Sequence, residues 1–182
     1  MFQQRTVSVL AFLAAVLAVA SLGGPLPAKA TPNGPALLPN QPTTRHVALL
    51  KGSGGELSFP VLELAHSIIS PRDSASGLPT GKRQHKPFTI TKSVDEASPA
   101  LFMALLEGEP FTTVEITTLR RVGGRFVPFT TVRLETAFVG ALNSGSGADR
   151  PTEEVAFYYN KIGWSYAETG TTVEDFWAGE YP

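Results

Sequence analysis

Alternation of apolar and polar residues is the feature that most restricts how this 182-residue chain can fold. From residue 45 onward, β-branched and aromatic residues recur at every second position in short runs, and Gly, Pro, Asn and Ser separate the runs. Successive side chains of a strand point to opposite faces, so each run predicts a strand with one buried face. The folded part of the chain is therefore expected to be mainly β.

The runs also predict where strands lie and where they turn. Short strands are expected at 46–50 and 88–91, and a longer one at 57–69. Gly123 and Gly124 interrupt a long alternating stretch and predict a hairpin. A change of parity near 160–161 predicts a bulge or a barrel corner. The alternation places Leu62, Leu64 and Ile68 on one face of their strand, and Val132, Leu134 and Phe138 on one face of theirs. Before the corner Val155, Phe157 and Tyr159 hold one parity, and after it Ile162, Trp164 and Tyr166 hold the other.

One segment has the pattern of a helix. Ser98 is placed to cap it, Pro99 suits the first helical position, and Gly108 is a typical terminator. A short helix covering an open end or a face of the sheet is expected. The residues predicted to share its buried face are Leu101, Phe102, Leu105 and Leu106.

The N-terminus has the features of a secretory signal peptide at 1–30. Arg5 precedes an uncharged apolar run at 7–22, and Ala28-Lys29-Ala30 is a small-x-small cleavage pattern. The run is short for a membrane span, so we expect cleavage near Ala30, no stable membrane anchor, and a secreted or periplasmic product. Residues 31–44 contain four prolines and predict a Pro-rich leader.

Composition excludes several classes of site. The chain has no cysteine, so disulfides, thiolate metal ligands and a cysteine nucleophile are excluded. Its formal net charge of −1 gives no reason to expect nucleic acid or anionic lipid as a partner. An exported domain without disulfides must depend on its core or on partner subunits.

The segment at 70–86 is long, polar and rich in turn residues, and it is expected on the surface. Its Gly-x-x-x-Gly-Lys-Arg stretch is not a phosphate-binding loop. Such a loop needs four residues between its glycines and a hydroxyl residue after the lysine, whereas Gly77 and Gly81 enclose three and Arg83 follows Lys82. The nucleotide interpretation therefore fails.

No catalytic pattern is found. The spacing of His46, His66 and His85 does not match a metal site. We expect His66 to be a packed or hydrogen-bonded core residue, and His85, in the basic loop, to be a solvated surface residue or a subunit contact. A Gly-x-Ser-x-Gly elbow is absent, and the adjacent carboxylates at 95–96 and 153–154 do not by adjacency flank a substrate bond. We therefore expect no metal, no cofactor and no enzyme activity.

Three segments together resemble the Hcp (haemolysin-coregulated protein) family, the tube-forming proteins of type VI secretion systems. They are SPRDSASGLPTGKRQHKPFTITKSVDEASPALFMAL at 70–105, EEVAFYYNKIGWSY at 153–166 and TTVEDFW at 171–177. In the first segment GKRQHKP, Thr91-Lys92, Asp95 and Ala97-Ser98-Pro99 follow the family pattern in order. The resemblance covers 45–177, with a short tail at 178–182.

The resemblance implies a compact antiparallel β-barrel with one short α-helix. It also implies a hexameric ring that can stack into a tube and carry effector cargo, without a catalytic site. The loop at 70–86 would then reach a neighbouring subunit or ring, and Lys82, Arg83, His85 and Lys86 are the predicted subunit contacts. The chain departs from the family in its apparent signal peptide and in a shortened segment at 52–56.

A second class of function stays open from the residues. A secreted monomeric β-barrel could instead bind a cell-surface or glycan ligand. Trp164, Tyr166 and Trp177 could form a sugar-stacking surface, although aromatic residues near a barrel corner are more often core or interface.

Overall fold

The computed structural model describes residues 43–146 and 150–177. The predicted signal peptide, nearly all of the Pro-rich leader and the tail at 178–182 lie outside the described residues. The described residues form ten strands and one helix: β1 (Thr44–Gly52), β2 (Gly55–Val61), β3 (Glu63–Ala65), β4 (Ile68–Ile69), β5 (Gln84–His85), β6 (Phe88–Ser93), α1 (Ser98–Glu107), β7 (Phe111–Val122), β8 (Arg125–Ser146), β9 (Pro151–Tyr166) and β10 (Thr171–Phe176).

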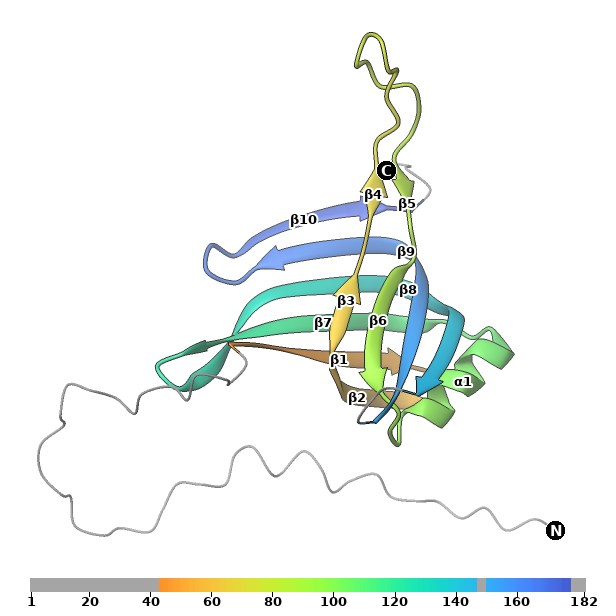
Figure 1. Ribbon diagram of the computed structural model, residues 1–182, viewed down its shortest axis with the longest axis vertical. Coiled ribbons are helices and arrows are strands. Elements are labelled where there is room, and N and C mark those ends of the chain that lie inside the picture. The colour runs from red at the N-terminus through yellow and green to blue at the C-terminus, as the bar shows by residue number, and fades with distance from the viewer. Residues whose placement is uncertain (1–42, 147–149, 178–182) are drawn as a thin grey trace, which may run out of the picture. The chain divides into compact units, whose positions relative to one another are not determined.

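Eight of these strands make one antiparallel sheet. Seven follow in the order β2-β1-β7-β8-β9-β6-β3, and β10 pairs with β9. The two ends of this order, β2 and β3, are consecutive in the chain, and the backbone N–H of Leu62 between them donates to the carbonyl of Thr91 on β6 at 2.8 Å. The sheet therefore curls round toward closure, with α1 at one end (Figure 1). The mainly β, barrel-like prediction with one helix is confirmed.

The core lies inside the curl. Alternate residues of the strands point into it, as on β6, where Phe88, Ile90 and Lys92 are buried and the residues between them are partly exposed. The largest fully buried apolar side chains are Phe88, Phe157, Leu50, Ile90, Leu101, Ile116, Leu134, Ile162, Val114 and Val155.

The predicted hairpin is confirmed. β7 and β8 pair as far as Val122 and Arg125, and the two residues between them, Gly123 and Gly124, have φ values of 57° and 83°. Positive φ at both central positions is the conformation of the tight turn that suits the twist of a hairpin, and glycine adopts it without a steric penalty.

The predicted corner is also confirmed, because the buried positions of β9 change parity between Tyr159 and Ile162. On the neighbouring strand β8, the parity of the buried positions changes at the same level of the sheet. Thr136 has a φ of 50°, and the buried positions of β8 pass from Leu134 to Ala137 across it. The prediction that Phe138 shares a face with Val132 and Leu134 is therefore wrong, because those two residues are buried and Phe138 is 36% exposed.

The single strand predicted at 57–69 is wrong as well. The structure divides it into β2, β3 and β4. Phe59 and Val61 are the buried residues of β2, whereas Leu62 and Ile68 are exposed. The reason is the change of sheet neighbour at Leu62, where the chain leaves β1 and joins β6, so one parity does not hold across the whole run.

The helix is present, but its buried face differs from the prediction. Leu101 is buried and Ala104 and Leu105 pack against the core, whereas Phe102 and Leu106 are 50% and 64% exposed. Gly108 ends the helix with φ 66°, as predicted. Ser98 is the first helical residue rather than the cap, and Asp95 accepts the N–H of Ala97 instead.

Candidate functional site

The loop at 70–83 stands out from the curled sheet on a two-stranded stem of β4 and β5 (Figure 1). Ile68 pairs with His85 and Ile69 with Gln84, and the N–H of Lys86 donates to the carbonyl of Ser67 at 3.0 Å. Nearly every residue of the loop is exposed. The predicted surface position of this segment is confirmed.

The loop holds a defined shape through its own hydrogen bonds. Asp73 Oδ1 accepts from the backbone N–H groups of Ala75 and Ser76 and from the Ser76 hydroxyl, at 3.1, 2.7 and 2.8 Å. These bonds, those from Ser76 first, lower the pKa of the Asp73 carboxyl below its ordinary value. Across the turn, Arg72 Nη1 donates to the carbonyl of Gly77 at 3.0 Å. The segment is thus a preorganised projection that needs little further ordering to bind a partner.

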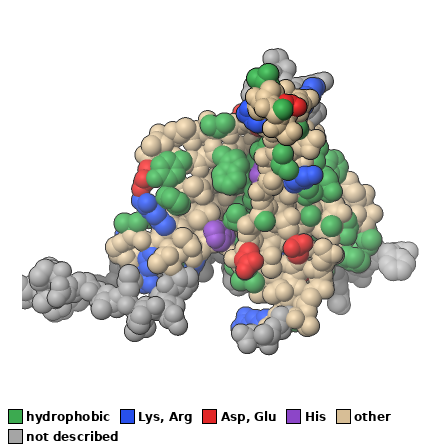
Figure 2. Space-filling view, turned by 45° about the horizontal axis from the view of Figure 1, so that its top comes forward, with side chains coloured by type: hydrophobic (Ala, Val, Ile, Leu, Met, Phe, Trp, Pro, Cys, Tyr) green, Lys and Arg blue, Asp and Glu red, His purple; other side chains and the backbone are tan. Residues whose placement is uncertain are grey.

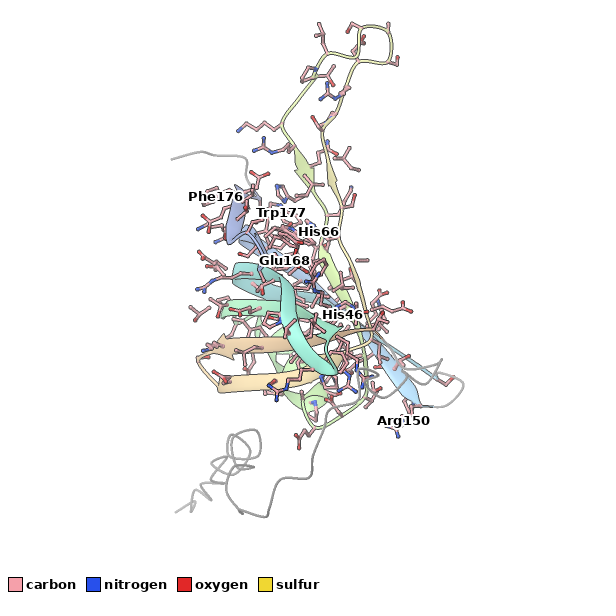
Figure 3. The ribbon with its side chains drawn as sticks, turned by 90° about the vertical axis from the view of Figure 1, so that its left-hand side faces the viewer. His46, His66, Arg150, Glu168, Phe176 and Trp177 are labelled. Carbon is pink, nitrogen blue, oxygen red and sulfur yellow. The ribbon has the colours of Figure 1, made fainter. Side chains whose placement is uncertain are left out.

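A group of side chains fastens the stem to the sheet, and we call it the anchor cluster: His66, Arg83, His85, Tyr159, Asp175 and Trp177. The Tyr159 hydroxyl lies 2.7 Å from His66 Nε2 and 2.9 Å from His85 Nδ1. Arg83 donates twice to the Asp175 carboxylate, both at 2.7 Å. His66 and Trp177 lie together at the base of the loop in Figure 3, and the Trp177 ring contacts those of His85 and Tyr159.

The proton positions in this cluster follow from its chemistry when the imidazoles are neutral. Asp175 Oδ2 can only accept, so His85 Nε2, 3.2 Å away, carries the proton toward it. His85 Nδ1 then accepts from the Tyr159 hydroxyl, and the Tyr159 oxygen accepts from His66 Nε2–H. Four side chains, His66, Tyr159, His85 and Asp175, are therefore joined in one directional chain of hydrogen bonds.

Burial and neighbouring charges reinforce this arrangement. The Arg83 guanidinium lowers the pKa of the Asp175 carboxyl and keeps it ionised. Burial raises the pKa of the Tyr159 hydroxyl, with a contribution from the Asp175 charge, so it stays a proton donor. Burial and then His85 lower the pKa of His66, which favours its neutral form.

The residues predicted as subunit contacts have different surroundings. Lys82 and Lys86 are exposed at the foot of the loop, and Figure 2 shows Lys and Arg side chains around the loop with hydrophobic side chains beneath it. Arg83 is partly exposed, but its guanidinium is paired with the Asp175 carboxylate of the same protomer. The predicted exposure of His85 is wrong: its side chain is 0% exposed, because Tyr159 and Trp177 cover it. His66 is half-buried, hydrogen-bonded and stacked on Phe88, as predicted.

A second buried polar group contains charged and polar residues of the stretch TKSVDEASP at 91–99. Lys92 Nζ donates to Asp95 Oδ1 at 2.7 Å, to Glu153 Oε1 at 2.9 Å and to the Ser93 carbonyl at 2.8 Å. The Ser98 hydroxyl donates to the same Glu153 oxygen at 2.7 Å. These contacts fix the start of α1 to β6 and β9. We call Lys92, Asp95, Ser98 and Glu153 the lysine cluster.

The aromatic residues considered for sugar stacking take separate roles. Trp177 belongs to the anchor cluster, and Trp164 is 40% exposed on β9. The Tyr166 ring packs on Phe129 and its hydroxyl donates to Glu168.

Neither metal ligation nor a membrane helix is indicated in the part of the chain that the structure describes. Within residues 43–146 and 150–177, no group of three or more His, Cys, Asp or Glu side chains is placed to hold a metal ion. Within the same ranges, no helix is long and apolar enough to cross a membrane.

Comparison with known proteins identifies relatives of most of the described domain. The family model described as "Type VI secretion system effector, Hcp" matches residues 51–166. The chain is 40% identical over 133 residues to the major exported protein of Pseudomonas aeruginosa, an alignment that covers 68% of this chain and 77% of that protein.

Solved structures give the same result for the fold. An Hcp protein of E. coli EAEC 042 aligns with a TM-score of 0.68 at 27% identity, over 73% of this chain and 98% of that one. A secreted Hcp protein of Pseudomonas aeruginosa aligns with a TM-score of 0.64 at 28% identity, over 74% of this chain and 98% of that one.

Proposed function

The chain belongs to the Hcp family of type VI secretion system proteins, and we propose that it acts as an exported tube protein that assembles into a hexameric ring. Its role is structural. The ring would be made by repeating one contact around a closed cycle, and the channel would carry a secreted effector. Closure of the ring would also bury the apolar side chains that a single protomer leaves exposed.

Exposed apolar side chains are the observation that carries this proposal. On α1, Phe102, Met103 and Leu106 are 50%, 49% and 64% exposed. Leu62, Leu78, Val94 and Val173 are exposed on other elements. The three residues of α1 are neighbours on the helix surface, at i+3 and i+4 spacing, and soluble monomers rarely expose such a contiguous apolar patch without a partner surface. Burial of these groups between copies would give a chain without cysteine a second source of stability.

The projecting loop supports a contact beyond one protomer. Because Arg83 is held by Asp175 inside the protomer, it positions the stem, and the cations best placed to meet a neighbouring subunit or ring are Lys82 and Lys86. Carboxylates or carbonyls of the neighbour are the partners that suit them. His85 would act indirectly, through the hydrogen bond to Tyr159 that keeps the stem in place.

Electron microscopy of the purified exported chain tests the proposal. Rings of uniform diameter with an open centre are expected, and stacked rings at high protein concentration. A chain that remains as single particles and is stabilised only by an added surface glycan would contradict the ring and favour a monomeric binding module.

Export is tested separately. We propose that residues 1–30 direct the chain to the general export route, with release near Ala30. The mature N-terminus can be read by mass spectrometry of the exported protein. An intact Met1 outside the cell would contradict cleavage without bearing on ring formation.

A further inference from the structure

A shallow apolar groove lies beside α1 at one end of the sheet. It has a volume of about 280 Å³, and Leu57, Met103 and Phe111 are among the residues that line it. Pockets for small molecules usually span ~300–1,000 Å³, so this groove is better matched to one or two side chains of a protein partner. The turn between β1 and β2 forms its opposite wall.

The rim of the groove is acidic. Glu107 is the last residue of α1 and Glu109 follows it, and both line the groove. The last turn of α1 contains no basic residue, so the partial negative charge of the helix C-terminus adds to the two carboxylates. The Ser53 hydroxyl donates to Glu109 Oε2 at 2.6 Å and holds that carboxylate at the rim. A partner for this site should present an apolar side chain beside a cation.

The tip of the β7–β8 hairpin has this combination. Val122 is 50% exposed and Arg125 is exposed, and the two are directly paired across the hairpin. Directly paired residues of an antiparallel ladder project on the same face, so an apolar group and a guanidinium stand side by side. Gly123 and Gly124 between them carry no side chain that would obstruct a close approach of the tip.

The tip and the groove lie at opposite ends of the same strand. Phe111 at the start of β7 lines the groove, and Val122 at its end forms the tip. Twelve residues of strand separate these ends by roughly 36 Å at ~3.3 Å per residue, and Figure 1 shows the hairpin and α1 on opposite sides of the sheet. One protomer therefore cannot fill its own groove with its own tip.

We propose that the β7–β8 tip of one copy enters the α1 groove of the next, with Val122 on the apolar floor and Arg125 against Glu107 and Glu109. This inference rests on the proposed ring and specifies its contact. Joining unlike surfaces is a heterologous arrangement, which closes into a ring when the rotation between copies allows it. The exposed Met103 is covered in the same contact.

Charge exchange between the two surfaces tests the contact. Arg125→Glu sets a carboxylate against an acidic rim, and Glu107→Arg with Glu109→Arg sets two cations against a basic tip. Each variant alone is expected to raise the dissociation constant of the ring at least about tenfold and to sediment mainly as monomer. Mixed in equal amounts, the two variants should recover rings, because every tip then meets a rim of opposite charge.

Controls separate this contact from the ring itself. Arg150 is an exposed arginine directly before β9, and Arg150→Glu should leave the ring intact. Rings that survive Arg125→Glu, or that are lost equally in Arg150→Glu, would overturn the tip-to-groove contact while the proposed function stands. Failure of the mixed variants to recover rings would also overturn it. Absence of rings in the unaltered chain would instead refute the proposed function.

Discussion

Replacing Lys92 by Met should be among the most damaging single changes to this domain. Lys92 is fully buried, and Glu153, its partner at 2.9 Å, is 2% exposed. Methionine keeps most of the volume but removes the positive charge, so the Glu153 carboxylate loses the ammonium donor and keeps the hydrogen bond from the Ser98 hydroxyl. Breaking a buried ion pair by removing one partner costs about 3–5 kcal/mol. We expect the free energy of unfolding to fall by that amount.

Urea unfolding followed by tryptophan fluorescence at one fixed protein concentration measures this loss, because assembly adds to apparent stability. Lys51→Met is the matched control: its pair with Glu56 at 3.2 Å is half exposed, and such pairs contribute about 0–1 kcal/mol. The double variant Lys92→Met with Glu153→Met removes both buried charges and should recover much of the loss. This account of the lysine cluster would be refuted if the free energy of unfolding of Lys92→Met lay within about 1 kcal/mol of that of the unaltered chain, with the same dependence of that free energy on urea concentration.

Three further changes test the anchor cluster and the loop. Tyr159→Phe leaves buried His85 Nδ1 without its donor and should lower the free energy of unfolding by about 1–3 kcal/mol in urea unfolding, whereas Tyr158→Phe, at a 45% exposed neighbour, should change it little. Folding lowers the pKa of His66, so the contribution of neutral His66 to stability is complete above the ordinary pKa of 6.5 and is lost as the pH falls below that value. Thermal melts from pH 8 to 5 should show this loss of stability, and the loss should be smaller in His66→Gln. Lys82→Glu with Lys86→Glu should leave the melt unchanged but reduce stacked species in light scattering, and undiminished stacking would exclude these cations from the contact.

The parts of the fold that local sequence determines were predicted well. Gly123-Gly124 requires a tight turn, and alternation on either side fixes two paired strands, so the β7–β8 hairpin could be placed without tertiary information. The corner near 160–161 was visible as a change of parity. A terminator glycine and a favourable first-turn proline marked the helix.

The errors arise where a neighbour elsewhere in the sheet decides the outcome. Leu62 lies in an alternating run, but the chain changes partner strand there, so the run divides. Phe138 follows Thr136, whose φ is positive and across which the buried parity of β8 shifts by one residue, and no glycine in the sequence signals this shift. The pairing of β10 with β9 was not predicted either.

The site shows the same limit. The loop and its exposed lysines followed from composition, whereas the burial of His85 depends on Tyr159 and Asp175, which are 74 and 90 residues away. One signal was available for the lysine cluster: Lys92 has the same strand parity as the buried Phe88 and Ile90. A charged residue at an inward position predicts a buried partner.

Self-association is the central claim, and the mass of the unaltered exported chain in solution tests it most directly. Sedimentation equilibrium over a range of protein concentrations below those at which rings stack should give one species with about six times the mass of a single chain, as a closed hexameric ring requires. A mass equal to one chain throughout that range would contradict the account.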